Sequence, residues 1–194
     1  MLYLTSSTMA TKLTSNTFSV PKSTLLPRGF YVNQGCCCKV CKEGNFTTHI
    51  STPNIPGRGF RIPVPVSCQS VNVVYVVTCP CGLQYVGKTS NPRNRWANHK
   101  SHIRNSDKTC NLATHCIEKH TQQMVGTKKL RNTIEIKSNL KFSILQSVGL
   151  EGTEEELELV EEHWRNRLKS WAPTGLNIRE DGPTRLRRKN IKVG

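Results

Sequence analysis

The sequence predicts a mixed α+β fold whose elements follow the order β-β-α-α-β-α. Three short runs rich in β-branched and aromatic residues have the length of strands, and two later segments carry the start signals of helices. The chain has 194 residues, which suffices for one small domain with appended arms.

The first three elements follow one another closely. Residues 71–78 (VNVVYVVT) indicate a buried strand, residues 79–82 (CPCG) a turn, and residues 84–88 the returning strand of a hairpin. Ser90-Asn91-Pro92 offers a capping side chain followed by proline at the first helical position, so we expect a helix to about residue 104.

The later elements have clear signals except in one segment. Residues 112–119 predict a short helix and residues 141–148 (KFSILQSV) a third strand, whereas the polar segment 121–139 is left unassigned. Thr153 and Glu156 form a capping box, which predicts a helix to about residue 170.

Composition divides the chain into four parts. We expect a disordered or leftover segment at 1–35, a cysteine-containing linker at 36–66, the packed domain at 67–180 and a basic tail at 181–194. The Ser/Thr-rich start also suits an organelle transit peptide. The run RLRRK at 185–189 suits a nuclear-import signal, a phosphate contact or a solvated end.

The charge balance predicts a polyanionic partner. The chain has 28 basic and 13 acidic residues, for a net charge of +15. Nucleic acid is the commonest such partner, and an anionic membrane surface or a merely soluble basic protein are the alternatives. No stretch approaches the roughly 20 apolar residues that a membrane span needs, which excludes a spanning protein. The 9 cysteines, without a secretory leader, favour metal ligation over disulfides.

Two groups of polar residues are candidates for a functional site. Tyr75 and Tyr85 lie in neighbouring strands, although two core tyrosines are the ordinary interpretation. Arg95, His99 and His102 have i, i+4, i+7 spacing and share a face of the first helix, where a solvated polar face is the alternative.

Glu161 stands at the edge of the apolar stripe of the last helix. A carboxylate beside a buried face is costly unless a metal ion or a cation compensates it. An ion pair with Arg165, one turn later, is the structural alternative to a metal site.

Together these residues resemble the GIY-YIG nucleases. Val73-Val74-Tyr75 followed by Tyr85-Val86-Gly87 is similar to the paired signature, with Val-Val replacing Gly-Ile. The resemblance implies a small three-stranded antiparallel sheet flanked by helices. It also implies a catalytic set, which comprises Tyr75, Tyr85, Arg95, His99, Glu161 and Asn177.

The resemblance implies metal-dependent hydrolysis of DNA phosphodiester bonds. Glu161 would hold Mg²⁺ or Mn²⁺, Arg95 would grip the phosphate, and Tyr75 would be the general base, its pKa lowered by nearby cations. Tyr85 and His99 would orient the phosphate or water, or move protons, and Asn177 would brace the site. Candidate substrate-binding residues are Gly87, Lys88 and His102.

Two groups of cysteines and histidines suggest zinc. Cys79 and Cys81 in the hairpin turn, with His115 and His120 downstream, offer a Cys2His2 set, with Cys116 a rival ligand. Buried thiols and surface histidines are the alternative. A second candidate site starts from Cys38 and Cys41, completed by Cys68 or Cys36 and perhaps by His49. Cys110 is interpreted as an ordinary thiol and not as a zinc ligand.

Cysteines between the two tyrosine motifs, followed by histidines, resemble the endonuclease of Penelope-like retroelements. That resemblance implies nicking of target DNA in the nucleus, and a reverse transcriptase region as partner in a full-length element. The alternatives are a relic that binds DNA but no longer cuts, and a zinc-stabilised nucleic-acid adaptor. Oligomeric state and sequence specificity stay open.

Overall fold

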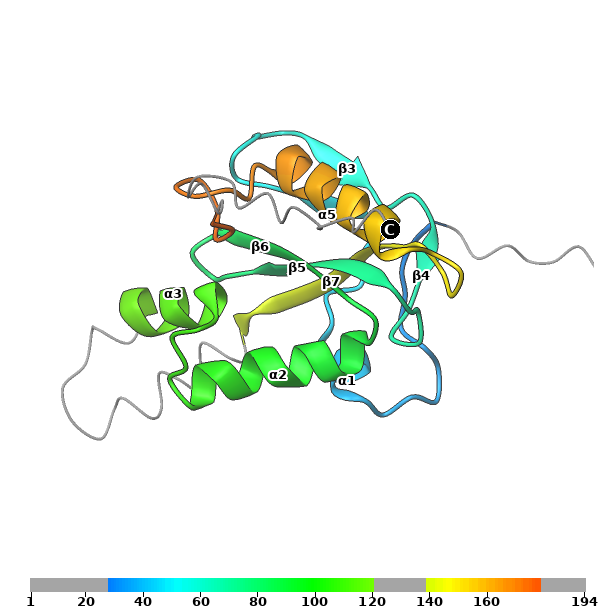
Figure 1. The fold of residues 1–194 in the computed structure, drawn as a ribbon, viewed down its shortest axis with the longest axis horizontal. Helices are drawn as coiled ribbons and strands as arrows, with labels where there is room; N and C mark the ends of the chain where they lie inside the picture. The colour runs from blue at the N-terminus through cyan, green and yellow to red at the C-terminus, as the bar shows by residue number, and fades with distance from the viewer. Residues whose placement is uncertain (1–27, 121–138, 179–194) are drawn as a thin grey trace, which may run out of the picture.

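A three-stranded antiparallel sheet forms the centre of the molecule, which confirms the predicted fold class. The computed structural model describes residues 28–120 and 139–178. The strands β5 (Val73–Thr78), β6 (Gln84–Thr89) and β7 (Lys141–Ser147) are ordered β6-β5-β7 (Figure 1). The predicted strand at 71–78 begins later, because Asn72 takes a left-handed conformation and bonds to the carbonyl of Gly149.

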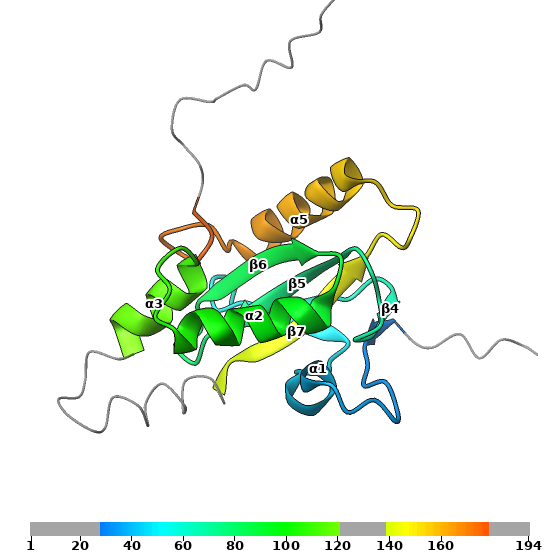
Figure 2. The ribbon, with the colours of Figure 1, turned by 60° about the horizontal axis from the view of Figure 1, so that its bottom comes forward.

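Helices cover both faces of this sheet, α5 on one side and α2 on the other (Figures 1 and 2). The helix α2 (Pro92–Arg104) begins as predicted, because the Asn91 side chain accepts from two backbone N–H groups of its first turn. The helix α5 (Glu154–Leu168) has the predicted capping box at Thr153 and ends where Lys169 becomes left-handed. The short helix α3 (Asn111–His120) packs beside α2.

The core is continuous between the sheet and its helices. Trp96 of α2 stacks near Phe142 of β7, with ring centroids 5.1 Å apart, and Trp164 of α5 donates to the side chain of Gln146. Burial of large aromatic side chains on both faces explains why β5 shows no polar alternation. None of the helices in the described ranges has the length and apolarity to cross a bilayer.

The packed unit begins earlier than the expected boundary at residue 67. Small elements precede the sheet: β1 (Gly29–Phe30), α1 (Lys39–Glu43), β2 (His49–Ser51), β3 (Gly59–Arg61) and β4 (Pro65–Val66). Their apolar side chains, among them Phe30, Val40 and Ile62, are fully buried in the same core as the sheet. Residues 28–35 and 36–66 are therefore part of the fold. The rest of the expected N-terminal arm and the basic tail lie outside the described residues.

The outer edge of β6 is covered by the segment that follows α5. The N–H of Leu176 donates to the carbonyl of Gln84, and the side chain of Asn177 bonds to the backbone of Val86. An open edge would leave unpaired backbone groups on this strand. The C-terminal segment therefore seals the strand that carries the second tyrosine motif.

Candidate active site

Tyr75 and Gly87 face each other across β5 and β6, and the glycine makes room for the phenol. The two residues are paired in the strand register. A Cβ atom on Gly87 would lie 2.5 Å from the phenol oxygen of Tyr75, closer than any real contact. The phenol of Tyr75 thus lies over the glycine, and only 1% of the residue is exposed. Gly87 therefore contributes to the site by leaving space for the Tyr75 ring.

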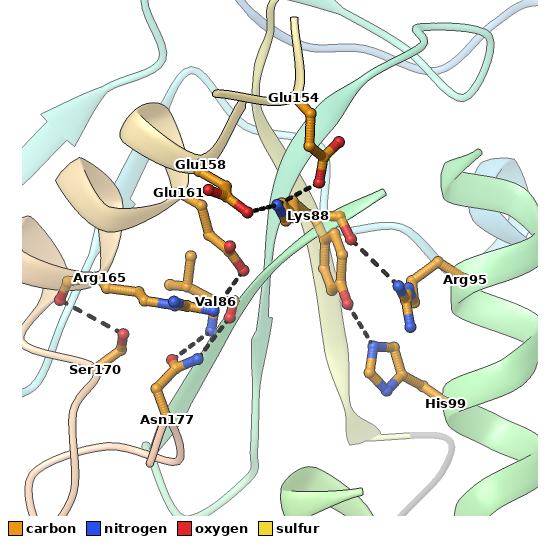
Figure 3. Close-up of polar contacts among 11 residues, drawn as sticks. Val86, Lys88, Arg95, His99, Glu154, Glu158, Glu161, Arg165, Ser170 and Asn177 are labelled. Carbon is orange, nitrogen blue, oxygen red and sulfur yellow. Dashed lines mark hydrogen bonds and ion pairs between the residues drawn. The ribbon is translucent and has the colours of Figure 1, made fainter. Parts of the chain in front are cut away.

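A short hydrogen bond joins Tyr75 to the helix on the same face of the sheet. Its hydroxyl lies 2.7 Å from Nε2 of His99, which is 3% exposed (Figure 3). The other ring nitrogen of His99, Nδ1, lies 3.7 Å from Sγ of Cys110. Burial, reinforced by the positive charge of Arg95, lowers the pKa of His99 to about 3. The imidazole is therefore neutral at pH 7.

The expectation that nearby cations lower the pKa of Tyr75 is wrong for this structure. Burial raises the pKa of Tyr75 well above its ordinary value, and it raises that of Tyr85 as well. The charge of Arg95 acts in the opposite direction on both phenols but is outweighed. Both phenols are therefore protonated at neutral pH, since removal of water disfavours the phenolate.

A pocket of about 230 Å³ opens beside this buried pair. Arg95, His99 and His102 line it, which confirms that the helix face groups them. Its remaining wall comprises Tyr85, Asn98, Thr109, Cys110 and Asn111. Arg95 is exposed and donates only a long 3.4 Å bond to the carbonyl of Lys88. Because a guanidinium presents five N–H donors, most of those of Arg95 face the pocket or solvent.

His102 is held at the rim of the pocket by an acid. Its Nδ1 lies 2.6 Å from a carboxylate oxygen of Asp107. Hydrogen bonds from Thr109, together with this histidine, lower the pKa of Asp107 to about 2. The acid therefore fixes the orientation of the His102 ring at the pocket wall.

Glu161 is buried at the face of α5 that packs on β6, as its place beside the apolar stripe predicted. The residue is 5% exposed, and its Oε1 accepts a 2.6 Å bond from Arg165. This is the ion pair that the sequence offered as an alternative to a metal site. Burial raises the pKa of Glu161, and the positive charges of Arg165 and Lys88 oppose that shift. Within the described residues, Oε2 of Glu161 makes no hydrogen bond and remains available to a ligand.

Lys88, expected to contact substrate, is paired with acids in this structure. Its Nζ bonds to carboxylates of Glu154 and Glu158 in the first turns of α5 (Figure 3). These partners lie 66 and 70 residues away in the chain. The pairing links the end of β6 to α5.

Asn177 braces β6 through its side-chain amide. Its Oδ1 accepts from the N–H of Val86 at 2.9 Å, and its Nδ2 donates to the carbonyl of Val86 at 2.7 Å. The residue is buried and contributes no group to the pocket. This geometry matches the bracing role that the resemblance implied.

The candidate residues form two groups around β6. Figure 3 shows Glu161 and Arg165 on one side of this strand and Arg95 and His99 on the other. No hydrogen bond within the described residues joins Glu161 to Arg95. Their charges nevertheless act on the same phenol, since Glu161 contributes to the raised pKa of Tyr85 and Arg95 opposes it. The phenol of Tyr85 therefore lies within electrostatic range of both groups.

Of the two carboxylate oxygens of Glu161, one is suited to bind a divalent ion and the other is bonded to Arg165. Mg²⁺ and Mn²⁺ prefer oxygen ligands and retain several waters, so one protein carboxylate with a substrate phosphate is a sufficient anchor. Glu161 would supply that carboxylate, since its Oε2 makes no hydrogen bond within the described residues. Arg165 competes for the other oxygen, so its guanidinium compensates the buried charge when no ion is bound.

The predicted Cys2His2 set is assembled in space. Ligand atoms of Cys79, Cys81, His115 and His120 all lie within 4.8 Å of one another. Sγ of Cys79 lies 3.2 Å from Nε2 of His120, and the Cys81–His115 pair has the same separation. A tetrahedral zinc ion needs such a set of four. Cys116 stays outside this group and is buried in the core.

The second cluster contains both of the cysteines that the sequence offered as alternatives. Sγ atoms of Cys36, Cys38, Cys41 and Cys68 lie within 4.8 Å of one another. His49 is exposed on β2, where its Nδ1 contacts Thr48 instead.

The sequence interpretation missed Cys110 and the asparagines of the pocket. Cys110 contacts His99, while Asn98 and Asn111 line the pocket wall. A lone cysteine or asparagine carries no pattern, and these three come together only when α3 packs on α2.

Comparison with protein families identifies the domain. Residues 71–173, more than half of the chain, match the GIY-YIG catalytic domain. Comparison with curated proteins and with solved structures finds no match. The matched range contains both tyrosine strands, the helix with Arg95 and the helix with Glu161. The chain belongs to the GIY-YIG family, whose membership implies endonuclease activity in general.

Proposed function

We propose that this protein is a divalent-metal-dependent endonuclease that hydrolyses phosphodiester bonds of DNA, and that it nicks target DNA for a retroelement. One observation carries the proposal. His99, which is hydrogen-bonded to the buried Tyr75, lines a pocket together with Arg95 on one side of β6, and the carboxylate of Glu161 lies on the other side of this strand. A phosphate with a bound cation would bring these two groups into one reaction centre.

Phosphate would enter from the pocket side. Arg95 and Tyr85 are the partly or fully exposed members of the set, whereas Tyr75 and His99 are buried behind them. Arginine binds phosphate oxygens through charge-assisted, often bidentate hydrogen bonds. Arg95 is therefore the proposed phosphate ligand, with Tyr85 and His102 as neighbours. The net charge of +15 would attract DNA to the protein.

The carboxylate of Glu161 would hold the ion through Oε2. A divalent ion supplies Lewis acidity and lowers the pKa of water and of nearby hydroxyls. The role of Arg165 then follows from the ion pair, since it balances the buried carboxylate when the ion is absent.

The buried pair of Tyr75 and His99 would manage the proton. At neutral pH the imidazole is neutral and the phenol is protonated, so the hydroxyl donates to Nε2 of His99. This assigns the N–H of His99 to Nδ1, on the side of Cys110. Because burial disfavours the charged forms of both groups, the proton stays on Tyr75 until a bound divalent cation adds positive charge nearby. Tyr75 is accordingly the proposed base only in the loaded complex.

The retroelement assignment has a separate support. A Cys2His2 cluster has its two cysteines in the turn between the tyrosine strands, as in the endonucleases of Penelope-like elements that the sequence resembles. We therefore propose a nuclear setting, with a reverse transcriptase region as the partner in the full element.

Nicking of supercoiled plasmid tests the enzymatic part of the proposal. Wild-type protein with Mg²⁺ should convert supercoiled to relaxed DNA, and EDTA should stop it. Arg95→Ala and Glu161→Gln should each reduce the rate by about 100-fold or more, the usual cost of losing a transition-state contact. Arg104→Ala on α2 and Glu155→Gln on α5 are the matched exposed controls and should keep the wild-type rate.

Cleavage that survives both Arg95→Ala and Glu161→Gln would refute the site. The second candidate function is a catalytically inactive, zinc-stabilised DNA-binding protein derived from such an element. The occupied Oε1 of Glu161 and the raised pKa of Tyr75 favour it. Fluorescence anisotropy separates the two functions, because the inactive protein would bind labelled DNA without cutting it in Mg²⁺ or Mn²⁺.

A further inference from the structure

A second group of thiols lies far from the hairpin turn and takes no part in the proposed reaction. Three of its members, Cys36, Cys38 and Cys41, lie just before and within α1. The fourth, Cys68, lies in the loop between β4 and β5, is 2% exposed and is 27 residues from Cys41. Two separate segments thus place their sulfur atoms together.

The sulfur positions have the spacing of a tetrahedral metal shell. Sγ of Cys41 lies 3.3 Å from Sγ of Cys68, which lies 3.6 Å from Sγ of Cys36. Zinc–sulfur bonds of about 2.3 Å place the ligands of a regular tetrahedron about 3.8 Å apart. A disulfide needs about 2.05 Å, and none of these four cysteines is in a disulfide. Cys37, between two of the ligands, is exposed and outside the group.

From this geometry we infer that Cys36, Cys38, Cys41 and Cys68 bind a structural zinc ion, which fixes the N-terminal segment to the catalytic domain. Zinc is the divalent metal that all-cysteine tetrahedral sites usually hold. The proposal concerns the fold of residues 28–68 and is independent of whether the protein cuts DNA.

The surroundings suit the charge of such a site. Zinc with four thiolates carries a net charge of about −2, and a cation next to it is favourable. Arg93, in the first turn of α2, donates from Nε to the carbonyl of Cys68 at 3.1 Å. Glu43, at the other end of α1, points away to Trp96 and Lys100. Arg93 therefore places a positive charge beside the proposed zinc ligands.

The ion would hold the small N-terminal elements in place. These elements contain 2 to 5 residues each, too few to be stable by themselves. The cluster ties the start of α1 to the loop before β5, while Glu43 ties its end to Trp96 at 3.0 Å. Arg93 of α2 bonds to Cys68 of the cluster, and Trp96 of α2 bonds to Glu43. The same helix carries Arg95 and His99. The site thus orients α2 as well as α1.

Metal content and cadmium NMR of the whole chain test the inference. Wild-type protein, purified under reducing conditions and dialysed, should hold about two zinc ions, one for each cluster. Cys68→Ser and Cys38→Ser should each retain about one, as should Cys79→Ser in the other cluster. Cys37→Ser is the matched control in the same cysteine run and should keep both ions.

Wild-type protein loaded with ¹¹³Cd covers the case in which a variant fails to fold. An all-sulfur site should give a resonance downfield of that from a site with two sulfur and two nitrogen ligands. Two resonances, one in each range, are expected. Loss of an ion in Cys37→Ser, full zinc content in Cys68→Ser, or the absence of an all-sulfur cadmium signal would each overturn the inference. Hydrogen exchange in zinc-depleted protein should increase first within residues 28–68.

Discussion

Lowering the pH from 7 to 5 should destabilise the wild-type protein more than a His99→Gln variant. In the folded protein His99 is buried against Tyr75 and its pKa is about 3, whereas in the unfolded chain it titrates near its ordinary value of 6.5. Between these two values the unfolded state binds a proton that the folded state does not. Stability is therefore fully present above pH 6.5 and is lost as the pH falls from there toward 3.

The two pKa values determine the size of the effect. Each pH unit within the window costs up to about 1.4 kcal/mol, so the change from pH 7 to 5 removes about 2 kcal/mol of the free energy of unfolding through His99 alone. Solvent screens this effect little, because only 3% of the residue is exposed. Such a loss is a large fraction of the 5–15 kcal/mol by which domains are typically stable.

Urea unfolding, followed by tryptophan fluorescence at pH 7, 6 and 5, measures this difference. Trp96 and Trp164 are buried and report on both faces of the sheet. If the two proposed clusters hold zinc, protonation of their ligands would also destabilise the fold at low pH, but it would do so in both proteins and cancel in the comparison. His163→Gln, at an exposed site on α5, is the control and should keep the wild-type pH dependence. If wild type and His99→Gln lose stability in parallel between pH 7 and 5, His99 is not buried as a neutral ring and the proton assignment fails.

Two other substitutions probe the strand at the centre of the site. Gly87→Ala should displace the phenol of Tyr75, lower the free energy of unfolding by about 1–3 kcal/mol and reduce nicking. Gly59→Ala is the control and should be tolerated, because the nearest atom to an added Cβ lies at 3.8 Å. Thermal unfolding and the plasmid assay measure both variants. Asn177→Leu should cost about 1–3 kcal/mol, because it leaves the buried N–H and carbonyl of Val86 unpaired, and the same unfolding measurement would contradict this if stability stayed at the wild-type value.

Elements with local signals were predictable from the sequence. The hairpin, the Asn91 cap and the Thr153 capping box depend on neighbouring residues, and all three occur as predicted. The N-terminal elements were missed, because strands of two or three residues are too short to show periodicity. They are stabilised by contacts that are distant in sequence, such as the N–H of Asn45 donating to the carbonyl of Phe142.

For the candidate site, the sequence suggested which residues lie close together but not their protonation states. Tyr75 and His99 were named from sequence, yet the direction of the tyrosine pKa shift depends on burial, which only the packed fold determines. The partners of Lys88 were equally hidden, since Glu154 and Glu158 are nearby only because α5 lies over β6. Which residues share one face of a strand or helix can be predicted from the sequence, whereas contacts between elements require the tertiary structure.

Lys88 contacts both of the helices that flank β6. Its backbone carbonyl accepts from Arg95 on the α2 side, and its Nζ pairs with Glu154 and Glu158 on the α5 side. Both acids are mostly exposed, so these ion pairs contribute little stability and are broken at a low cost. A phosphate beside Arg95 would offer the ammonium a stronger partner than either carboxylate. Release of the Lys88 ammonium from α5 would then add positive charge at the edge of β6, so the pairing seen without substrate is compatible with a role in binding DNA.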